Sequence, residues 1–329
     1  SNSDRYEYVL PSYGFSKNFN LENIDGNFNF SSSGNNTLSS TNVSTSTLSN
    51  DLNYSTSNFY FDNGITSSFE VFLKNINSVG KNSSQYKTSP QSEIMSAYAY
   101  NASYPLIKNT KRSLNVLEPK LSFRFSPHEM KNNRNVDRRI DASNVFNTNR
   151  LSINNSFEGG ESITLGLDYK KEKVTTKNEI KEIEEYFDFK LATVFRLEEE
   201  ENIPTNSTIN KKTSNIFGQF NYKPIKNVSL YYNFSLNNDL NYLEYNSINA
   251  KVEFDHITTT FNFIEERGIV GNTNMIENTT LFNFNEENTL LFNTRRNRKL
   301  NLTEYYDLVY EYKNDCLIAG LKYKKKYYN

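Results

Sequence analysis

The most regular feature of this sequence is the alternation of apolar and polar residues. The segment 303–324 contains two alternating runs that are joined by a short polar turn. In the first run, every second position is apolar or aromatic: Tyr306, Leu308, Tyr310 and Tyr312. Side chains of a strand point alternately to opposite faces of its sheet, so each run predicts a strand with one apolar and one polar face.

Similar runs recur along most of the chain. We place about sixteen strands at 6–15, 28–32, 52–55, 69–73, 95–100, 117–125, 163–169, 187–197, 216–222, 228–236, 250–254, 258–263, 277–284, 290–294 and in the two runs of 303–324. Dividing 329 residues by sixteen gives roughly 20 residues per strand and connection, whereas strands of soluble sandwiches recur every 8–12 or so. Outer-membrane barrels combine strands of about ten residues with alternating short turns and long loops.

The connections alternate in length in the same way. Short turns are expected at 223–227, 255–256, 285–288 and 313–315, and long polar loops at 198–214, 237–247, 265–275 and 295–302. One segment breaks the rule, because Lys170 to Glu185 is charged, helix-like and long where a short turn is due. Its role is left unassigned. The fold class that we predict is all-β, a transmembrane antiparallel β-barrel.

Composition agrees with a membrane barrel. Only 36% of the residues are hydrophobic and the mean hydropathy is −0.73, which would be low for a soluble globule. Yet 24 Phe and 23 Tyr occupy alternating positions, which disordered chains lack. No apolar run reaches the roughly 20 residues of a membrane helix, so strands are the expected means of crossing a membrane. The net charge of −1 argues against a nucleic-acid partner.

Other classes remain open on pattern alone. The stretch from Ser31 to Ser57 is so rich in Asn, Ser and Thr that a secreted adhesin or a β-solenoid is an alternative, although no fixed repeat is found. A porin or receptor barrel is a further alternative.

Candidate chemistry is scarce, and we predict no enzyme activity, cofactor or metal. The two histidines, His128 and His256, stand far apart and are expected in turns. The acidic run from Glu198 to Glu201 is expected to be a solvated loop, and Gly159-Gly160 lacks the other elements of a phosphate loop.

One basic cluster stands out. Arg295, Arg296, Arg298 and Lys299 lie within five residues of a predicted loop. A solvated loop tip and an anion contact are both compatible with this cluster. Because the rest of the chain is neutral, the anion that fits is a lipid phosphate.

Three blocks resemble a known family. They are Leu117-Glu-Pro-Lys-Leu-Ser-Phe-Arg-Phe-Ser-Pro127, Asp137-Arg-Arg-Ile-Asp-Ala-Ser-Asn144 and Thr164-Leu-Gly-Leu-Asp-Tyr169. They are similar to the barrel of the LptD (OstA/Imp) family of lipopolysaccharide-assembly proteins, and the hairpin around Cys316 resembles a cysteine-bearing strand pair of that family. The resemblance runs from about Tyr6 to the end of the chain.

The resemblance implies a non-enzymatic translocon in the outer membrane of a Gram-negative bacterium, which inserts lipopolysaccharide into the outer leaflet. The family's barrel has 26 strands, an LptE-like lipoprotein plugs its lumen, and a periplasmic jellyroll connects it to the Lpt bridge. Residues 1–329 would then be a single barrel domain, truncated at both ends, with the lateral gate and the jellyroll outside this chain. Cys316 would form a disulfide with a cysteine of the jellyroll region.

The alternation also predicts orientation. Leu230, Tyr232 and Phe234 are expected to face lipid. Glu118, Lys120 and Arg124 are expected to face the lumen, because a charged side chain at the lipid-facing midplane costs about 2–4 kcal/mol.

Overall fold

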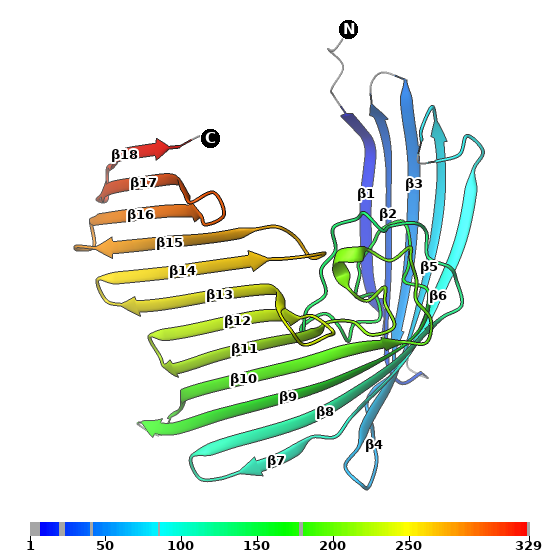
Figure 1. Ribbon diagram of the computed structural model, residues 1–329, viewed down its shortest axis with the longest axis horizontal. Coiled ribbons are helices and arrows are strands. Elements are labelled where there is room, and N and C mark those ends of the chain that lie inside the picture. The colour runs from blue at the N-terminus through cyan, green and yellow to red at the C-terminus, as the bar shows by residue number, and fades with distance from the viewer. Residues whose placement is uncertain (1–6, 20–23, 40–41, 85, 178–179, 328–329) are drawn as a thin grey trace.

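The computed structural model describes residues 7–19, 24–39, 42–84, 86–177 and 180–327, and it shows one curved antiparallel sheet of eighteen strands (Figure 1). The strands are β1 (Glu7–Phe19), β2 (Asn27–Ser39), β3 (Val43–Ser55), β4 (Phe59–Tyr60), β5 (Thr66–Lys81), β6 (Gln91–Ser103), β7 (Leu106–Asn109), β8 (Ser113–Ser126), β9 (Gly160–Lys177), β10 (Ile180–Arg196), β11 (Ile216–Ile225), β12 (Val228–Leu236), β13 (Leu243–Phe254), β14 (Ile257–Glu266), β15 (Asn274–Asn283), β16 (Asn288–Asn297), β17 (Leu302–Lys313) and β18 (Ile318–Lys326). The all-β antiparallel class that the sequence predicts is confirmed.

The eighteen strands occupy sixteen positions in the sheet. The short strand β4 pairs with β5 beyond the end of β3, and β7 pairs with β8 beyond the end of β6, so each continues the line of the strand before it. Pro105 separates β6 from β7 and lacks the amide hydrogen that a continuous ladder would need. The estimate of about sixteen strands is therefore confirmed as a count of positions.

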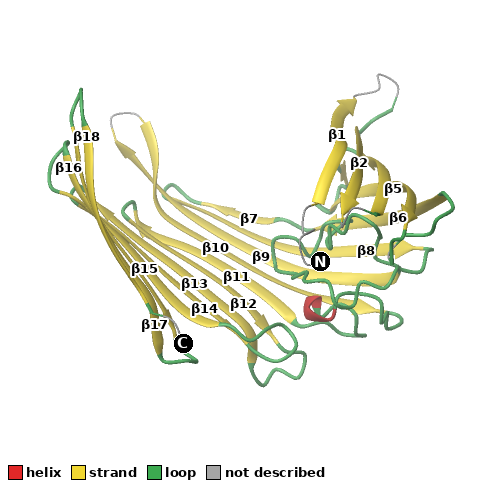
Figure 2. Cartoon of the chain, turned by 90° about the horizontal axis from the view of Figure 1, so that it is seen from above, coloured by secondary structure: helices red, strands yellow, loops and turns green. Residues whose placement is uncertain are grey.

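Every longer strand pairs with its neighbour in the sequence, and the wall that results is open. Among the described strands, β1 pairs only with β2 and β18 only with β17. Figure 2 shows the wall from above, with the loops and the short 3₁₀ helix at Thr205–Ser207 gathered beside β8. No helix among the described residues is long and apolar enough to cross a membrane.

The two edges of the wall differ. We call the edge that carries the connections 127–159, 197–215 and 298–301 the loop edge, and the opposite edge, with 226–227, 255–256 and 314–317, the turn edge. The predicted alternation of long and short connections holds best in the middle of the chain.

The described residues of the segment from Lys170 to Glu185 are strand and not helix, so the helix-like interpretation is wrong there. Strands β9 and β10 run through it as far as Lys177 and Ile180, which pair with each other. Its charges are arranged across the hairpin, with Lys171 Nζ lying 3.7 Å from Glu185 Oε1. Opposite charges on neighbouring strands stabilise pairing, so the helix-like composition belongs to an extension of β9 and β10.

The loops expected at 237–247 and 295–302 are also shorter than predicted, since β13 already begins at Leu243. Strand β16 extends to Asn297 and β17 begins at Leu302, so only 298–301 connect them. Two of the four residues of the basic cluster, Arg295 and Arg296, therefore lie in a strand.

Candidate functional site

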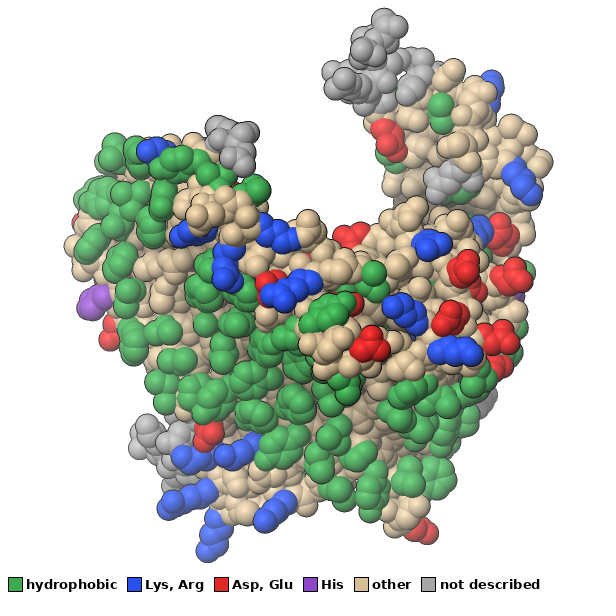
Figure 3. All heavy atoms as spheres, in the orientation of Figure 1, with side chains coloured by type: hydrophobic (Ala, Val, Ile, Leu, Met, Phe, Trp, Pro, Cys, Tyr) green, Lys and Arg blue, Asp and Glu red, His purple; other side chains and the backbone are tan. Residues whose placement is uncertain are grey.

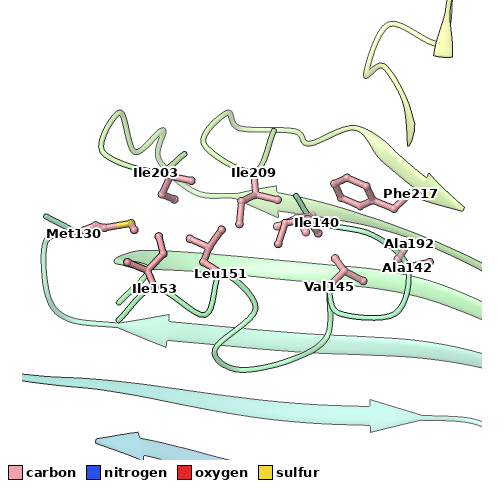
Figure 4. Close-up of a cluster of buried hydrophobic side chains, with 11 residues drawn as sticks. Met130, Ile140, Ala142, Val145, Leu151, Ile153, Ala192, Ile203, Ile209 and Phe217 are labelled. Carbon is pink, nitrogen blue, oxygen red and sulfur yellow. The ribbon is translucent and has the colours of Figure 1, made fainter. Parts of the chain in front are cut away.

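Two loops of the loop edge pack against one face of the wall, which we call the inner face. The loops are 127–159 and 197–215, and between them and β10–β11 lies the main hydrophobic cluster (Figure 4). The cluster consists of Met130, Ile140, Ala142, Val145, Leu151, Ile153, Ala192, Val194, Ile203, Ile209 and Phe217. Burying these side chains is favourable, so the loops are a packed part of the fold.

A buried ion cluster fixes the loop 127–159 to three strands. The Glu158 carboxylate of this loop receives two hydrogen bonds from Arg150, at 2.8 Å from Nε to Oε2 and 2.6 Å from Nη2 to Oε1. Arg196 of β10 donates to the same Oε1 at 2.7 Å, and Arg124 Nη1 of β8 lies 3.6 Å from it. The loop arginine Arg150 also donates to Ser162 of β9. All four charged side chains are at most 3% exposed.

Backbone carbonyls complete the coordination of the three guanidiniums. Arg124 donates to the carbonyl oxygens of Thr148 and Glu158 at 3.0 and 2.6 Å, and Arg196 donates to that of Gly159 at 2.5 Å. One carboxylate faces three cations, and the carbonyl dipoles offset part of the remaining positive charge. The Gly159-Gly160 pair therefore belongs to this anchor.

The protonation state of Glu158 follows from its surroundings. Burial by itself would raise the pKa of the Glu158 carboxyl group, but the guanidiniums of Arg124, Arg150 and Arg196 outweigh burial and hold the pKa well below its ordinary value. The carboxylate is thus ionised at neutral pH.

Aromatic stacking adds a second anchor next to the ions. Phe157 stacks on Phe72 of β5 with ring centroids 4.8 Å apart, and the Arg124 guanidinium lies 4.8 Å from the centroid of the Phe157 ring. Phe72 and Phe157 form a second buried cluster with Ile76, Met95 and Ala97. Residues 157–158 thus bind the loop to β5, β8 and β10 at once.

The inner face continues toward the turn edge as a charged surface. Lys120 Nζ lies 2.7 Å from Asp168 Oδ2 and 3.5 Å from Glu118 Oε2, and these three side chains line a cavity of about 390 Å³. Glu118, Lys120 and Arg124 occupy alternate positions of β8 and so share the inner face, as expected from the sequence.

The opposite, outer face is apolar over most strands. Leu230, Tyr232 and Phe234 of β12 lie on it, and the Tyr232 and Phe234 rings stack at 5.4 Å. Strands β9, β10 and β11 carry a further group of rings in contact near the turn edge, made by Tyr169, Phe187, Phe220 and Tyr222. Figure 3 shows broad hydrophobic areas below and to the left of the loops, with Lys and Arg side chains at their borders.

The basic cluster at the loop edge is divided between the two faces. Arg295 is on the inner face, where its Nε lies 2.5 Å from Glu304 and its Nη1 3.6 Å from Glu277. Arg296 pairs with Ile276 in the register and shares the outer face with it. Arg298 reaches over the ring of the outer residue Phe263, at 5.6 Å from its centroid, and Lys299 donates to a backbone carbonyl.

Residues of β18 extend this basic edge. Lys324, Lys325 and Lys326 lie where β18 pairs with the start of β17, so they are at the loop edge beside the cluster. Together with Arg296, Arg298 and Lys299 they form what we call the basic rim. No local sequence pattern groups the three lysines with the arginines, because a complete strand, β17, separates them.

Cys316 lies in the exposed turn 314–317 of the turn edge. The Asn314 side chain accepts hydrogen bonds from the amides of Cys316 and Leu317, at 3.0 and 2.8 Å, and so shapes this turn. The thiol is free in this chain, which has no second cysteine.

The remaining candidates do not meet in one site. His128 Nδ1 accepts a hydrogen bond from the Ser96 amide, whereas His256 lies in the turn between β13 and β14 on the other edge. The acidic run 198–201 borders a cavity of about 730 Å³ with Glu129 and Glu161. No group of metal-ligating side chains suited to an ion is found in the described part of the chain.

The charges of the anchor around Glu158, the most buried among the described residues, were not predicted from the sequence. Glu158, Arg150 and Arg196 are far apart or isolated in the sequence, so no local pattern reveals their contact. One residue could have indicated the cluster. Arg124 is a charge on the predicted inner face of a strand, and such a charge needs a partner, here supplied by a loop.

Comparison with known protein families matches residues 6–281 to the family described as LptD, LPS transport system D. No curated protein matches the chain.

Proposed function

Since this chain belongs to the LptD family of lipopolysaccharide transport proteins, we propose that it forms the wall of an outer-membrane translocon that inserts lipopolysaccharide into the outer leaflet without enzymatic chemistry. The observation that carries the proposal is the two-faced wall. Its outer face presents apolar and aromatic side chains, and its inner face presents paired charges beneath packed loops. Strands with such alternation suit a lipid exterior and a polar lumen.

The open wall supports a larger barrel. Both edge strands, β1 and β18, expose backbone groups that would be costly in hydrocarbon. We propose that residues 1–329 make up one barrel domain and that further strands of the same barrel pair with both edges, in the 26-stranded arrangement of the family.

The inner face offers a place for a lumenal partner. The loops 127–159 and 197–215 occupy its loop-edge half, whereas the charged cavity around Lys120 is on the turn-edge side. An LptE-like lipoprotein entering from the turn edge would meet paired charges there. With the short turns in the periplasm, the same edge would receive the jellyroll that connects to the Lpt bridge.

We assign roles to Cys316 and to the basic cluster from the edge of the wall at which each of them lies. Cys316 is on the turn edge and exposed, so it is available for a disulfide with a cysteine of the periplasmic part of the protein. Arg295, Arg296, Arg298 and Lys299 are at the loop edge, where lipid phosphates of the outer leaflet would lie. Arg295 already has two carboxylate partners, so Arg296, Arg298 and Lys299 are the phosphate contacts that we propose.

Depletion of the intact protein tests the proposed function. We expect lipopolysaccharide detected by antibody on intact cells to fall and the molecule to accumulate inside the outer membrane. A small-solute uptake assay serves as the counter-test. Loss of solute uptake with unchanged surface lipopolysaccharide would show a porin or receptor instead.

The disulfide has its own test. In non-reducing electrophoresis of the intact protein, Cys316→Ser is expected to abolish a mobility difference that reductant also abolishes. Labelling of Cys316 by a maleimide in untreated cells, with no such mobility difference, would contradict the pairing.

A further inference from the structure

The outer face of β2, β3 and β5 changes from apolar toward polar side chains along the height of the wall. On β2, Phe28 and Phe30 are followed toward the loop edge by Ser32, Gly34 and Asn36, all on the outer face. The register places the same change on the neighbouring strands. There, outer-face Tyr54 and Leu52 give way to Asn50, Leu48 and Ser46 on β3, and Val71 and Leu73 to Asn75, Asn77 and Val79 on β5. The continuous apolar band therefore ends partway up these strands, and above it amides and hydroxyls alternate with single apolar side chains such as Leu48 and Val79.

A row of hydrogen bonds marks the border. Ser32 donates to Asn50 at 2.7 Å, Asn50 to Asn75 at 3.2 Å, and Asn75 to Ser92 at 3.3 Å. The Tyr13 hydroxyl meets Ser32 at 3.0 Å. The row crosses β1, β2, β3, β5 and β6. Amide side chains would be costly within hydrocarbon, so this border indicates that the upper parts of these strands stand beyond the lipid chains.

A groove of about 390 Å³ lies on the upper, mixed part of this face. The Tyr13 ring forms one side of it, 51% exposed, and it lies directly over Gly34. A Cβ at Gly34 would be 2.6 Å from Tyr13 Cε1, so the ring's position depends on this glycine. Asn36, Asn77 and Gln91 supply amides to the groove, and its apolar surface comes from Pro11, Leu48, Val79 and Pro90.

The chemistry of the groove selects a class of ligand. None of its lining residues carries a formal charge, whereas the basic rim is formed by β16–β18 at the other end of the wall. An exposed aromatic face beside amide and hydroxyl groups suits a neutral ligand with apolar C–H faces and many hydroxyls. Such a ligand is a sugar ring.

We propose that this groove, formed by Tyr13, Gly34, Asn36, Asn77 and Gln91, binds the saccharide part of lipopolysaccharide just above the lipid band. This deepens the proposed function and rests on it for the identity of the glycan. The Tyr13 ring stacks on a sugar face, while the amides hydrogen-bond to ring hydroxyls. The basic rim and the sugar groove would then contact different parts of the same class of molecule.

Binding of lipid-free core oligosaccharide, released by mild acid hydrolysis, to the intact protein in detergent tests the inference. We expect saturable binding that Tyr13→Ala weakens by roughly tenfold, the effect of losing about one aromatic contact. Tyr13→Phe retains the ring and is expected to bind as the wild type does. Tyr60→Ala, which removes a 77% exposed tyrosine near the turn edge, is the matched control.

Several results would overturn the inference. They are no binding to the wild type, equal binding by wild type and Tyr13→Ala, or equal losses in Tyr13→Ala and Tyr60→Ala. If Tyr13→Ala fails to fold, as judged by heat-modifiable electrophoretic mobility, Asn36→Leu takes its place with the same expected loss. Normal surface delivery of lipopolysaccharide without oligosaccharide binding would contradict the sugar groove and leave the proposed function standing. Oligosaccharide binding without surface delivery would contradict the proposed function and leave a saccharide-binding groove.

Discussion

Two groups of arginines in this wall behave in opposite ways. Arg124, Arg150 and Arg196 are spread over 73 residues of sequence, yet they meet around Glu158 in the interior. The arginines at 295–298 are adjacent in sequence, yet the strand sends them to different faces and leaves them at the rim. The arginines that are neighbours in the sequence are exposed at the rim, whereas those that the fold brings together form a buried anchor. We therefore expect the larger contribution to the free energy of unfolding from the buried group, which no local sequence pattern reveals.

Removing the negative charge of Glu158 should have the largest effect on stability. Glu158→Gln leaves three buried guanidiniums without a carboxylate, and we expect it to destabilise the folded wall by about 3–5 kcal/mol. Chemical unfolding in detergent measures the change. Glu199→Gln, at an exposed position of the loop 197–215, is the control and should change little. A small effect of Glu158→Gln would place the anchoring energy in the hydrophobic cluster.

Acid should remove the same contribution from the wild type. The pKa of Glu158 is lowered by the guanidiniums, so its stabilisation is complete above the ordinary pKa of about 4.3 and is lost as the pH falls from there toward the folded-state value. The difference in unfolding free energy between wild type and Glu158→Gln should therefore be constant from pH 7 to about pH 5 and shrink below about pH 4. A difference that persists unchanged in acid would show that Glu158 acts through its shape and not through its charge.

Truncating the stacked ring should cost somewhat less. Phe157→Ala removes the contacts with Phe72 and Arg124, and a buried Phe→Ala change costs about 3 kcal/mol. Limited proteolysis should then cut the loop 127–159 while the strands remain intact. Cleavage that begins instead in the strands would mean that the loop and the wall unfold as one unit.

The rim should give the smallest effect on stability. Arg298 has a cation–π contact with Phe263 at an exposed site, so Arg298→Ala should cost no more than about 1 kcal/mol. The Arg298→Ala variant should also bind vesicles that contain lipopolysaccharide with a weaker dependence on salt than the wild type. The reason is that the variant has lost one contact with a lipid phosphate. Identical salt dependence of the two proteins would contradict a phosphate contact at this position.

The sequence predicted the wall better than the site. Alternation located all sixteen strand positions, because successive residues of a strand point to opposite faces and so differ in polarity, as in Val228–Leu236. The alternation did not reveal the strands at Lys170 to Glu185, because charged residues there occupy both faces. It also did not reveal the polar end of β16 at Arg295, which was predicted as a loop. The contacts of Glu158 depend on how a loop folds back, which no local pattern contains.

The fixed position of the loop 127–159 has a mechanical consequence. Through Phe157 and Glu158 it ties β5, β8 and β10 together, so this half of the wall is cross-braced on its inner face in addition to its backbone ladder. Arg139 of the same loop also pairs with Glu266 of β14 and lies over the Tyr245 ring of β13. From β15 to β18, adjacent strands are joined by the ladder, by side-chain pairs between neighbouring strands and by short connections. A load that spreads the wall would bend β15–β18 first. Elastic compliance would thus be concentrated on the side of β18, while the braced half keeps its curvature.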